Sequence, residues 1–241
     1  MPHKPTDDHS GHHHEHDHSH QDTQKELERI FSAIRQPVNI LLFTQKNRNE
    51  TYNDLARQIL QLLGQVSDKI IVNTYGLDHA LAEKYEITQS PTLLFEPETV
   101  NIRWLGAPTG EEGRTLVELL LLLGFQNPNL NEDAAQVLEQ ITDARHIKVF
   151  VSPSCPYCPQ QAVNAIKAAV ARPGLISVEL IDIQAFPEIA DEYGAQSVPQ
   201  AFANEVLIAM GAQTEELFAA SLIKMEQQNF FIPDSDAPEI T

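Results

Sequence analysis

The stretch Pro153-Ser154-Cys155-Pro156-Tyr157-Cys158-Pro159 decides the fold of this chain, because it joins two patterns typical of different secondary structure. The apolar run Lys148-Val149-Phe150-Val151-Ser152 before it indicates a buried strand, and the apolar spacing from Pro159 to Val170 after it indicates an amphipathic helix. Cysteines at such a junction face free backbone amides and the positive end of the helix dipole, which favour the thiolate. The context therefore predicts a reactive dithiol.

The two cysteines have different predicted roles. Cys155 should have a pKa below the ordinary value of about 8.5 and act as the attacking thiol. Cys158, one helical turn further on, should be more buried and should resolve a mixed disulfide between Cys155 and a substrate. Pro156 suits an early helical position, since its missing N–H costs no hydrogen bond there.

A second proline completes the predicted site. Pro199, in Ser197-Val198-Pro199, is predicted to follow a cis peptide bond, which is cheap only before proline and would turn the backbone toward the dithiol. The backbone of Val198 could then pair with an extended substrate segment. Pro156 and Tyr157, between the cysteines, are predicted as further substrate contacts.

Three alternatives stay open from the residues alone. The cysteines could be half of a zinc site, although His146 is the one histidine that this half of the chain offers. They could also be packing residues without chemistry. Pro199 could be an ordinary turn proline.

The chain contains the same plan twice. Ala82-Glu83-Lys84-Tyr85 and Ser90-Pro91 match Ala190-Asp191-Glu192-Tyr193 and Val198-Pro199 at one constant shift, 199 − 91 = 108. The same shift aligns the strand pattern 40–44 with 148–152 without a gap. Two domains follow from one duplicated plan.

Each copy predicts the same order of elements: a helix, an apolar strand, a turn, a long helix, a second strand, a short helix that ends at Tyr85 or Tyr193, and a strand opened by an X-Pro step. This order indicates an α/β layer structure with a mixed sheet. The predicted boundaries are, in chain order, a tail at 1–23, a first domain at 24–127, a second domain at 132–227 and an acidic tail at 228–241.

On these residues the chain resembles the thioredoxin/glutaredoxin superfamily, over about residues 25–225. The Cys155-Pro156-Tyr157-Cys158 quartet looks like a glutaredoxin active site. The tandem plan resembles the glutaredoxin-like protein disulfide oxidoreductases and the amino-terminal domain of alkyl hydroperoxide reductase flavoproteins. The resemblance implies two tandem thioredoxin-like folds.

The resemblance also implies an activity: reversible dithiol exchange on protein disulfides, as a reductase or electron carrier. Cys155 would be the nucleophile, Cys158 the resolving thiol and Pro199 the cis proline. The implied partners are disulfide-containing proteins, a peroxidase among them, and an upstream thiol reductase. No cofactor is implied.

The sequence departs from this family in three places. Shifted back by 108 residues, the two cysteines fall on Asn47 and Glu50, so the first copy is either a docking domain or a degenerate one. The strand pattern 147–151 lacks the buried carboxylate that thioredoxins carry before the dithiol. The turn 211–215, followed by Glu216, only approximates a glutathione-binding turn, so glutathione is not the expected substrate.

Composition narrows the function classes. The formal charge of −18, from 34 acidic and 16 basic residues, argues against nucleic acid or an anionic membrane as partner. The polar start, residues 1–24, has no apolar segment of the signal-peptide kind, which makes the cytoplasm the expected location. The longest apolar stretch, within 116–123, is too short to span a bilayer and predicts a buried helix.

Eight of the ten histidines lie in the first 20 residues. The metal ligands predicted there are His12, His13, His14, His16, His18 and His20. Imidazoles interleaved with carboxylates suit zinc, nickel or copper, bound loosely by a flexible tail, whereas the alternative is a purification tag. The competing function is therefore a metal-handling protein, or metallochaperone, that uses this tail with or without the thiols.

Overall fold

The computed structural model describes residues 24–224. The two predicted tails, with the histidines at 12–20, lie outside these residues. After a helix over 24–32, the elements are β1 (Val38–Thr44), α2 (Glu50–Val66), β2 (Ile70–Gly76), α3 (Ala80–Lys84), β3 (Thr92–Phe95), β4 (Ile102–Leu105), α4 (Glu112–Phe125), α5 (Glu132–Glu139), β5 (Arg145–Val151), α6 (Cys158–Ala171), β6 (Ile176–Asp182), α7 (Pro187–Glu192), β7 (Gln200–Ala203), β8 (Val206–Met210) and α8 (Glu215–Ile223).

The eight strands form one mixed sheet in the order β2-β1-β3-β4-β6-β5-β7-β8. In each half the first strand pairs in parallel with the second and antiparallel with the third. The last two strands of each half form an antiparallel pair. The predicted α/β fold of two tandem thioredoxin-like units is therefore confirmed.

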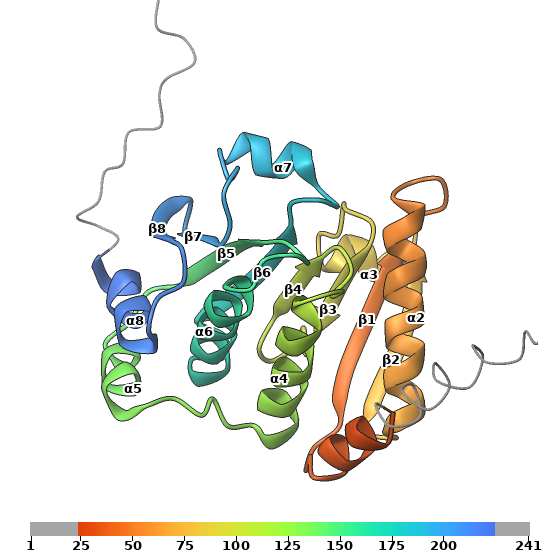
Figure 1. The fold of residues 1–241 in the computed structure, drawn as a ribbon, viewed down its shortest axis with the longest axis horizontal. Coiled ribbons are helices and arrows are strands. Elements are labelled where there is room, and N and C mark those ends of the chain that lie inside the picture. Colours follow the sequence, from red (N-terminus) through yellow and green to blue (C-terminus); the bar gives the residue numbers. More distant parts are fainter. Residues whose placement is uncertain (1–23, 225–241) are drawn as a thin grey trace, which may run out of the picture.

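The halves join through parallel pairing of β4 with β6, in the register Ile102↔Val178 to Leu105↔Ile181. This pairing places α4 of the first half against α6 of the second, side by side on one face of the sheet (Figure 1). The main core lies beneath these helices and includes Trp104, which is fully buried. The opposite face holds two smaller apolar clusters, one under α3 and one under α7.

The linker between the halves is tied to the second one by a buried lysine. Lys167 of α6 donates to the carbonyl oxygen of Asn129 at 2.9 Å and pairs with the carboxylate of Glu215. The second oxygen of Glu215 accepts the backbone N–H of Asn131 at 3.0 Å. These bonds hold the second part of the linker, at Asn129 and Asn131, against α6 and α8.

The apolar stretch 119–123 lies inside α4, where Leu119 and Leu120 are fully buried, as the sequence predicts. Among the helices of residues 24–224, none combines the length and the apolar character that crossing a membrane requires.

One glycine on α4 marks a close approach of this helix to the segment 34–36, which follows the first helix. The carbonyl oxygen of Gly124 accepts the backbone N–H groups of Arg35 and Gln36, both at 2.9 Å. A Cβ at this position would lie 2.7 Å from the Cβ of Ile34. The contact therefore requires glycine.

We predict that Gly124→Ala lowers the free energy of unfolding by about 1 to 3 kcal/mol, because the methyl group overpacks the contact with Ile34. Gly64→Ala in α2 is the control, since its Cβ would meet nothing within 4 Å; it should be neutral or stabilising by up to about 1 kcal/mol. Urea denaturation measures both. Equal shifts of the two midpoints would contradict the predicted overpacking.

Candidate redox site

The dithiol lies in a turn at the carboxyl end of β5. Ser152 follows the strand, and its carbonyl oxygen accepts the N–H of Cys155 at 3.0 Å. The carbonyl oxygen of Cys155 in turn accepts the N–H of Cys158 at 3.4 Å. Helix α6 begins at Cys158, with Tyr157 as its N-cap.

The helical position predicted for Pro156 is wrong. Pro156 lies in the turn before α6, and Pro159 occupies the first turn of the helix instead. The physical reason is that the turn 155–158 is closed by the N–H of Cys158, so regular helix starts only there. Pro159 then stands where a missing N–H costs no bond.

Cys155 and Cys158 form a disulfide with a Cα–Cα distance of 5.5 Å. Cys158 is fully buried, whereas Cys155 keeps 8% of its surface exposed. The backbone N–H of Cys158 points at Sγ of Cys155 at 3.1 Å. The amide field at the helix start therefore acts on Cys155, the outer of the two sulfur atoms, and the predicted order of burial is confirmed.

The proline loop lies beside the dithiol. The Val198–Pro199 bond is cis, as the sequence predicts. The carbonyl oxygen of Val198 is 3.7 Å from Sγ of Cys155. Pro199 is buried and Val198 half-buried, whereas Pro156 is exposed and Tyr157 has 66% of its surface exposed. The structure thus brings together all six residues predicted around the dithiol.

A third segment, the turn after β8, borders the site. Gly211 donates its N–H to the carbonyl oxygen of Pro199 at 2.8 Å. The carbonyl oxygen of Gln213 accepts the side-chain amides of Gln160 and Asn164, at 2.8 and 3.0 Å. These bonds use the turn's polar backbone groups to hold it against α6.

Two buried carboxyl groups near the dithiol loop are not among the residues predicted from the sequence. Glu112 is in the first turn of α4 and is 1% exposed. Its neighbour Glu111 donates a backbone N–H to the carbonyl oxygen of Pro153 at 2.9 Å, so this helix start contacts the dithiol loop. Asp182, the last residue of β6, is also 1% exposed.

Burial shifts both groups toward the protonated form. It raises the pKa of Glu112 to about 8; the Thr115 hydroxyl opposes the shift in part, and the charge of Asp182 adds to it. Burial also raises the pKa of Asp182, to about 6. The backbone N–H groups of Gln184 and Ala185 favour the carboxylate and make this rise smaller. Two buried carboxyl groups near the dithiol loop therefore have pKa values within reach of neutral pH.

Sequence signals for these two residues differ. An acidic residue at the end of the apolar strand 176–182 is a signal that could have identified Asp182. Glu112 has none, because it belongs to the other half of the chain. The strand before the dithiol carries no carboxylate, as the sequence shows, and the buried carboxyl groups come from α4 and β6 instead.

The described part of the chain contains no group of three or more His, Cys, Asp or Glu residues arranged to hold a metal ion. His146 lies on β5 and contacts the hydroxyl of Ser177 at 2.9 Å. Both cysteines are engaged in the disulfide. The zinc alternative therefore has no support within residues 24–224.

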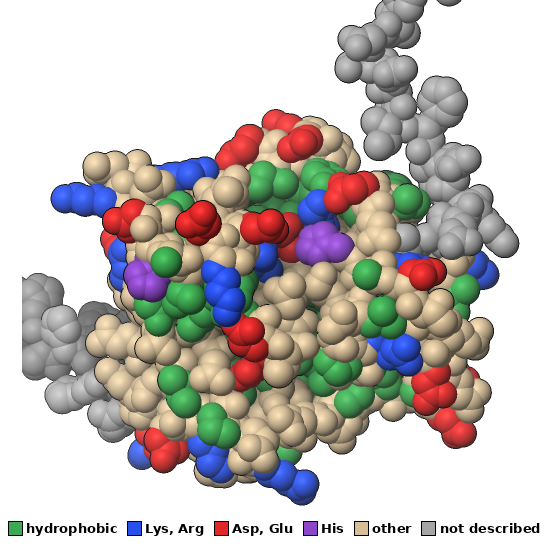
Figure 2. Space-filling view, turned by 180° about the vertical axis from the view of Figure 1, so that it is seen from behind, with side chains coloured by type: hydrophobic (Ala, Val, Ile, Leu, Met, Phe, Trp, Pro, Cys, Tyr) green, Lys and Arg blue, Asp and Glu red, His purple; other side chains and the backbone are tan. Residues whose placement is uncertain are grey.

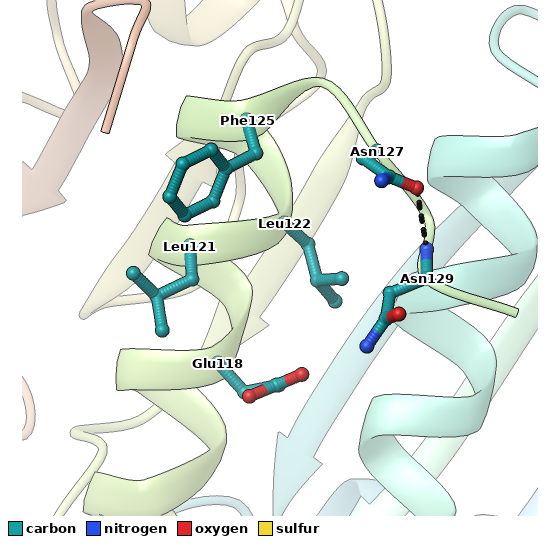
Figure 3. A pocket seen from close by; sticks show the side chains of 6 residues that line it. All are labelled: Glu118, Leu121, Leu122, Phe125, Asn127 and Asn129. Atoms are coloured by element: carbon teal, nitrogen blue, oxygen red, sulfur yellow. Dashed lines mark hydrogen bonds between the residues drawn. The ribbon is translucent and has the colours of Figure 1, made fainter. Parts of the chain in front are cut away.

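The surface offers a separate hollow, away from the dithiol. It lies between the end of α4 and the linker, has a volume of about 250 Å³, and is lined by Glu118, Leu121, Leu122, Phe125, Asn127 and Asn129 (Figure 3). No cysteine lines it, and Asn127 accepts the N–H of Asn129 at 2.9 Å within it.

The reverse face carries acidic and basic side chains side by side, not one patch of a single sign (Figure 2).

Comparison with known proteins gives two kinds of match. The thioredoxin domain model matches residues 145–224. A probable thioredoxin of Methanothermobacter thermautotrophicus is 45% identical over 83 residues, which are 34% of this chain and 96% of the relative. The alkyl hydroperoxide reductase AhpF of Pseudomonas aeruginosa is 26% identical over 200 residues, 80% of this chain but only 35% of that longer relative.

Solved structures match both halves. A protein disulfide oxidoreductase of Aeropyrum pernix is 27% identical with a TM-score of 0.76, over 88% of this chain and 95% of that one. The alkyl hydroperoxide reductase AhpF of Enterococcus faecalis is 23% identical with a TM-score of 0.75, over 84% and 98% of the two chains. This second likeness concerns the fold alone.

We predict that Glu112→Gln changes how stability depends on pH. A carboxyl group whose pKa rises from 4.5 unfolded to about 8 folded stabilises the protonated fold, and this contribution is lost as pH rises from about 4.5 through about 8. The oxidised wild type should thus lose a few kcal/mol of unfolding free energy over that window, and Glu112→Gln should lose less.

Urea denaturation of the oxidised proteins at intervals from pH 5 to pH 9 measures this. Glu118→Gln is the control, because it lies on the same helix and faces the hollow of Figure 3. Parallel pH curves for wild type and Glu112→Gln would refute the assignment.

Proposed function

We propose, because this chain belongs to the thioredoxin family, that it is a thiol–disulfide oxidoreductase that reduces disulfide bonds in other proteins. One observation carries the proposal, the surroundings of the outer sulfur atom of a disulfide at a helix start. Sγ of Cys155 accepts the backbone N–H of Cys158 at 3.1 Å. It also lies 3.7 Å from the carbonyl oxygen of Val198, the residue before the cis proline. The donor stabilises a thiolate, and the neighbouring backbone offers an edge for an extended substrate.

In the first step, the reduced protein attacks. The thiolate of Cys155 forms a bond with one sulfur of the substrate disulfide, the substrate S–S bond breaks, and the second substrate sulfur leaves as a thiolate that takes a proton from solvent. Exposed Tyr157 and the backbone of Val198 flank the sulfur and would contact the substrate chain.

In the second step, Cys158 loses its proton and attacks Sγ of Cys155. The intramolecular disulfide forms, the mixed disulfide breaks, and the substrate leaves with both electrons of the dithiol. Cys158 is fully buried, so it needs a base inside the protein. Glu112 is our candidate, since its helix start contacts the dithiol loop and packs beside α6.

The pKa of Glu112 agrees with that role. The value of about 8 belongs to the disulfide form, in which the carboxyl group would carry the proton received from Cys158. When an upstream thiol reductase opens the disulfide again, the same proton can return to Cys158. A group with a pKa near the working pH can do both.

The proposed direction, reduction, follows from the proposed cytoplasmic location, where thiols are kept reduced. The proposed partners are disulfide-containing proteins and an upstream thiol reductase. The likeness to the alkyl hydroperoxide reductase AhpF, over both halves, supports a peroxidase as one such partner. The chain covers about a third of that relative.

We predict that Cys155→Ser reduces insulin disulfides no faster than dithiothreitol alone, because the attacking sulfur is gone. Cys158→Ser should still attack but should accumulate a covalent adduct between Cys155 and an insulin chain, since nothing resolves it. Turbidity measures the first effect and mass spectrometry of the unreduced mixture the second. Insulin reduction by Cys155→Ser at the wild-type rate would end the proposal.

We also predict that Glu112→Gln slows the second step. The single-turnover rate constant for release of substrate from the mixed disulfide should fall about 10²- to 10⁴-fold, as expected for loss of a general base. Glu118→Gln, on the same helix, should match the wild type. Acid-quenched time courses measure the mixed disulfide; an unchanged lifetime in Glu112→Gln would exclude this residue as the base.

A further inference from the structure

The loop that stands in place of the dithiol in the first half contacts the second half directly. Asn49 occupies the position equivalent to Tyr157, because 157 − 108 = 49. Tyr157 is exposed at the dithiol, whereas Asn49 is half-buried. Its side-chain amide donates to the carbonyl oxygen of Ala185 at 2.9 Å. The same loop position thus faces solvent in the second half, as Tyr157, and contacts the second half when it lies in the first, as Asn49.

The loop holds Asn49 in a fixed place. Asn47 and Asn49 both have left-handed backbone angles, with φ of 62° and 55°. Arg48 between them donates to the carbonyl oxygen of Thr88 at 2.9 Å. Fully buried Asn53 donates to the carbonyl oxygen of Arg48 at 2.7 Å. Hydrogen bonds of Arg48 and Asn53 therefore hold the thiol-free loop on both sides of Asn49.

Ala185 belongs to the turn after β6, and this turn reaches the dithiol loop. The side-chain amide of Gln184 donates to the hydroxyl of Ser152 at 3.1 Å. The carbonyl oxygen of Ser152 accepts the N–H of Cys155 at 3.0 Å. A continuous path of hydrogen bonds and one peptide link thus joins Asn49 to the backbone of Cys155.

Tyr52 supplies a second contact from the same helix start. It packs against the apolar cluster that contains Phe186 and Ala185. Burial, with a smaller contribution from the charge of Asp182, raises the pKa of the Tyr52 hydroxyl. Asn49, the N-cap of α2, therefore contacts the turn after β6, and Tyr52 in the first turn of the helix packs against the cluster to which that turn belongs.

We infer that the thiol-free loop of the first half positions the dithiol, and that Asn49 is the positioning residue. Asn49 donates to the carbonyl oxygen of Ala185 and so fixes the turn after β6. From this turn the Gln184 side chain holds Ser152, at the start of the dithiol loop. The position of Ser152 in turn orients the backbone amides that point at Cys155. This inference rests on the proposed function in that Cys155 is the attacking thiol. It gives the first half a role in the reaction without a thiol of its own.

The test is the reactivity of Cys155 in the reduced full-length protein. Asn49→Gly removes the side chain and accepts the left-handed backbone. Without the bond to Ala185 the amides are less well oriented, so the pKa of Cys155 should rise. Its alkylation by iodoacetamide at pH 6 should slow about five-fold, the factor that corresponds to one hydrogen bond of about 1 kcal/mol. Peptide mass spectrometry assigns the alkylated cysteine.

Asn47→Gly is the matched control. It changes the same residue type, in the same loop and with the same backbone conformation, but the Asn47 side chain is exposed and makes no hydrogen bond within residues 24–224. It should react like the wild type. Equal slowing in both variants, or a lower melting temperature of Asn49→Gly with unchanged alkylation, would overturn the inference.

A double-mutant cycle tests the path. Gln184→Ala should slow alkylation of Cys155 as well, and Asn49→Gly with Gln184→Ala should be little slower than either single variant, because both act through one turn. Fully additive effects would overturn the path. Alkylation requires no protein substrate, so a reactive Cys155 in a protein that fails to reduce insulin would refute the proposed function and leave the positioning role intact.

Discussion

Parallel pairing of β4 with β6 is the constraint on which the rest of the structure depends. Each half alone would leave a strand with unpaired N–H and C=O groups at its edge, and the pairing satisfies these groups between the halves. It also fixes the lateral order of the helices, so that α4 packs against α6. The start of α4 then contacts the dithiol loop, and the buried carboxyl group of Glu112 follows directly after the residue that makes this contact.

The duplication kept the backbone of both sites while their chemistry diverged. In the first half the cis bond before Pro91 remains, and the hydroxyl of Ser90 bonds to buried Asn53 at 2.8 Å. Such a network is costly if half satisfied, which favours its retention as a rigid unit. A rigid loop without a nucleophile can act on its neighbour, because the shared sheet places it beside the turn after β6.

Most of the fold could be predicted from the sequence, and so could the residues that surround the dithiol. The constant shift between Pro91 and Pro199 aligns the elements from the first helix of each half to β3 and β7, whereas β8 and α8 begin four to five residues earlier than this shift places them. Strand period, helix period and X-Pro steps are local signals. The pairing of β4 with β6 is not local, because the four residues of β4 carry no sequence pattern that indicates which strand they pair with. Glu112 depends on that pairing, so it could not be predicted for the same reason. The error at Pro156 is smaller and arises because helix start depends on which N–H groups the turn already uses.

The proposed role of Glu112 also explains why a core would keep a polar residue. As a charged group, Glu112 would be costly to bury, but with a pKa raised to about 8 it is mostly protonated at neutral pH. The fold therefore avoids most of the charge penalty while the dithiol is oxidised. In the proposed mechanism, transfer of its proton to Cys158 creates the charge only when the disulfide opens, which couples the cost of burial to the redox state. Departures from a uniformly apolar core are expected at sites of this kind, where stability is given up for chemistry.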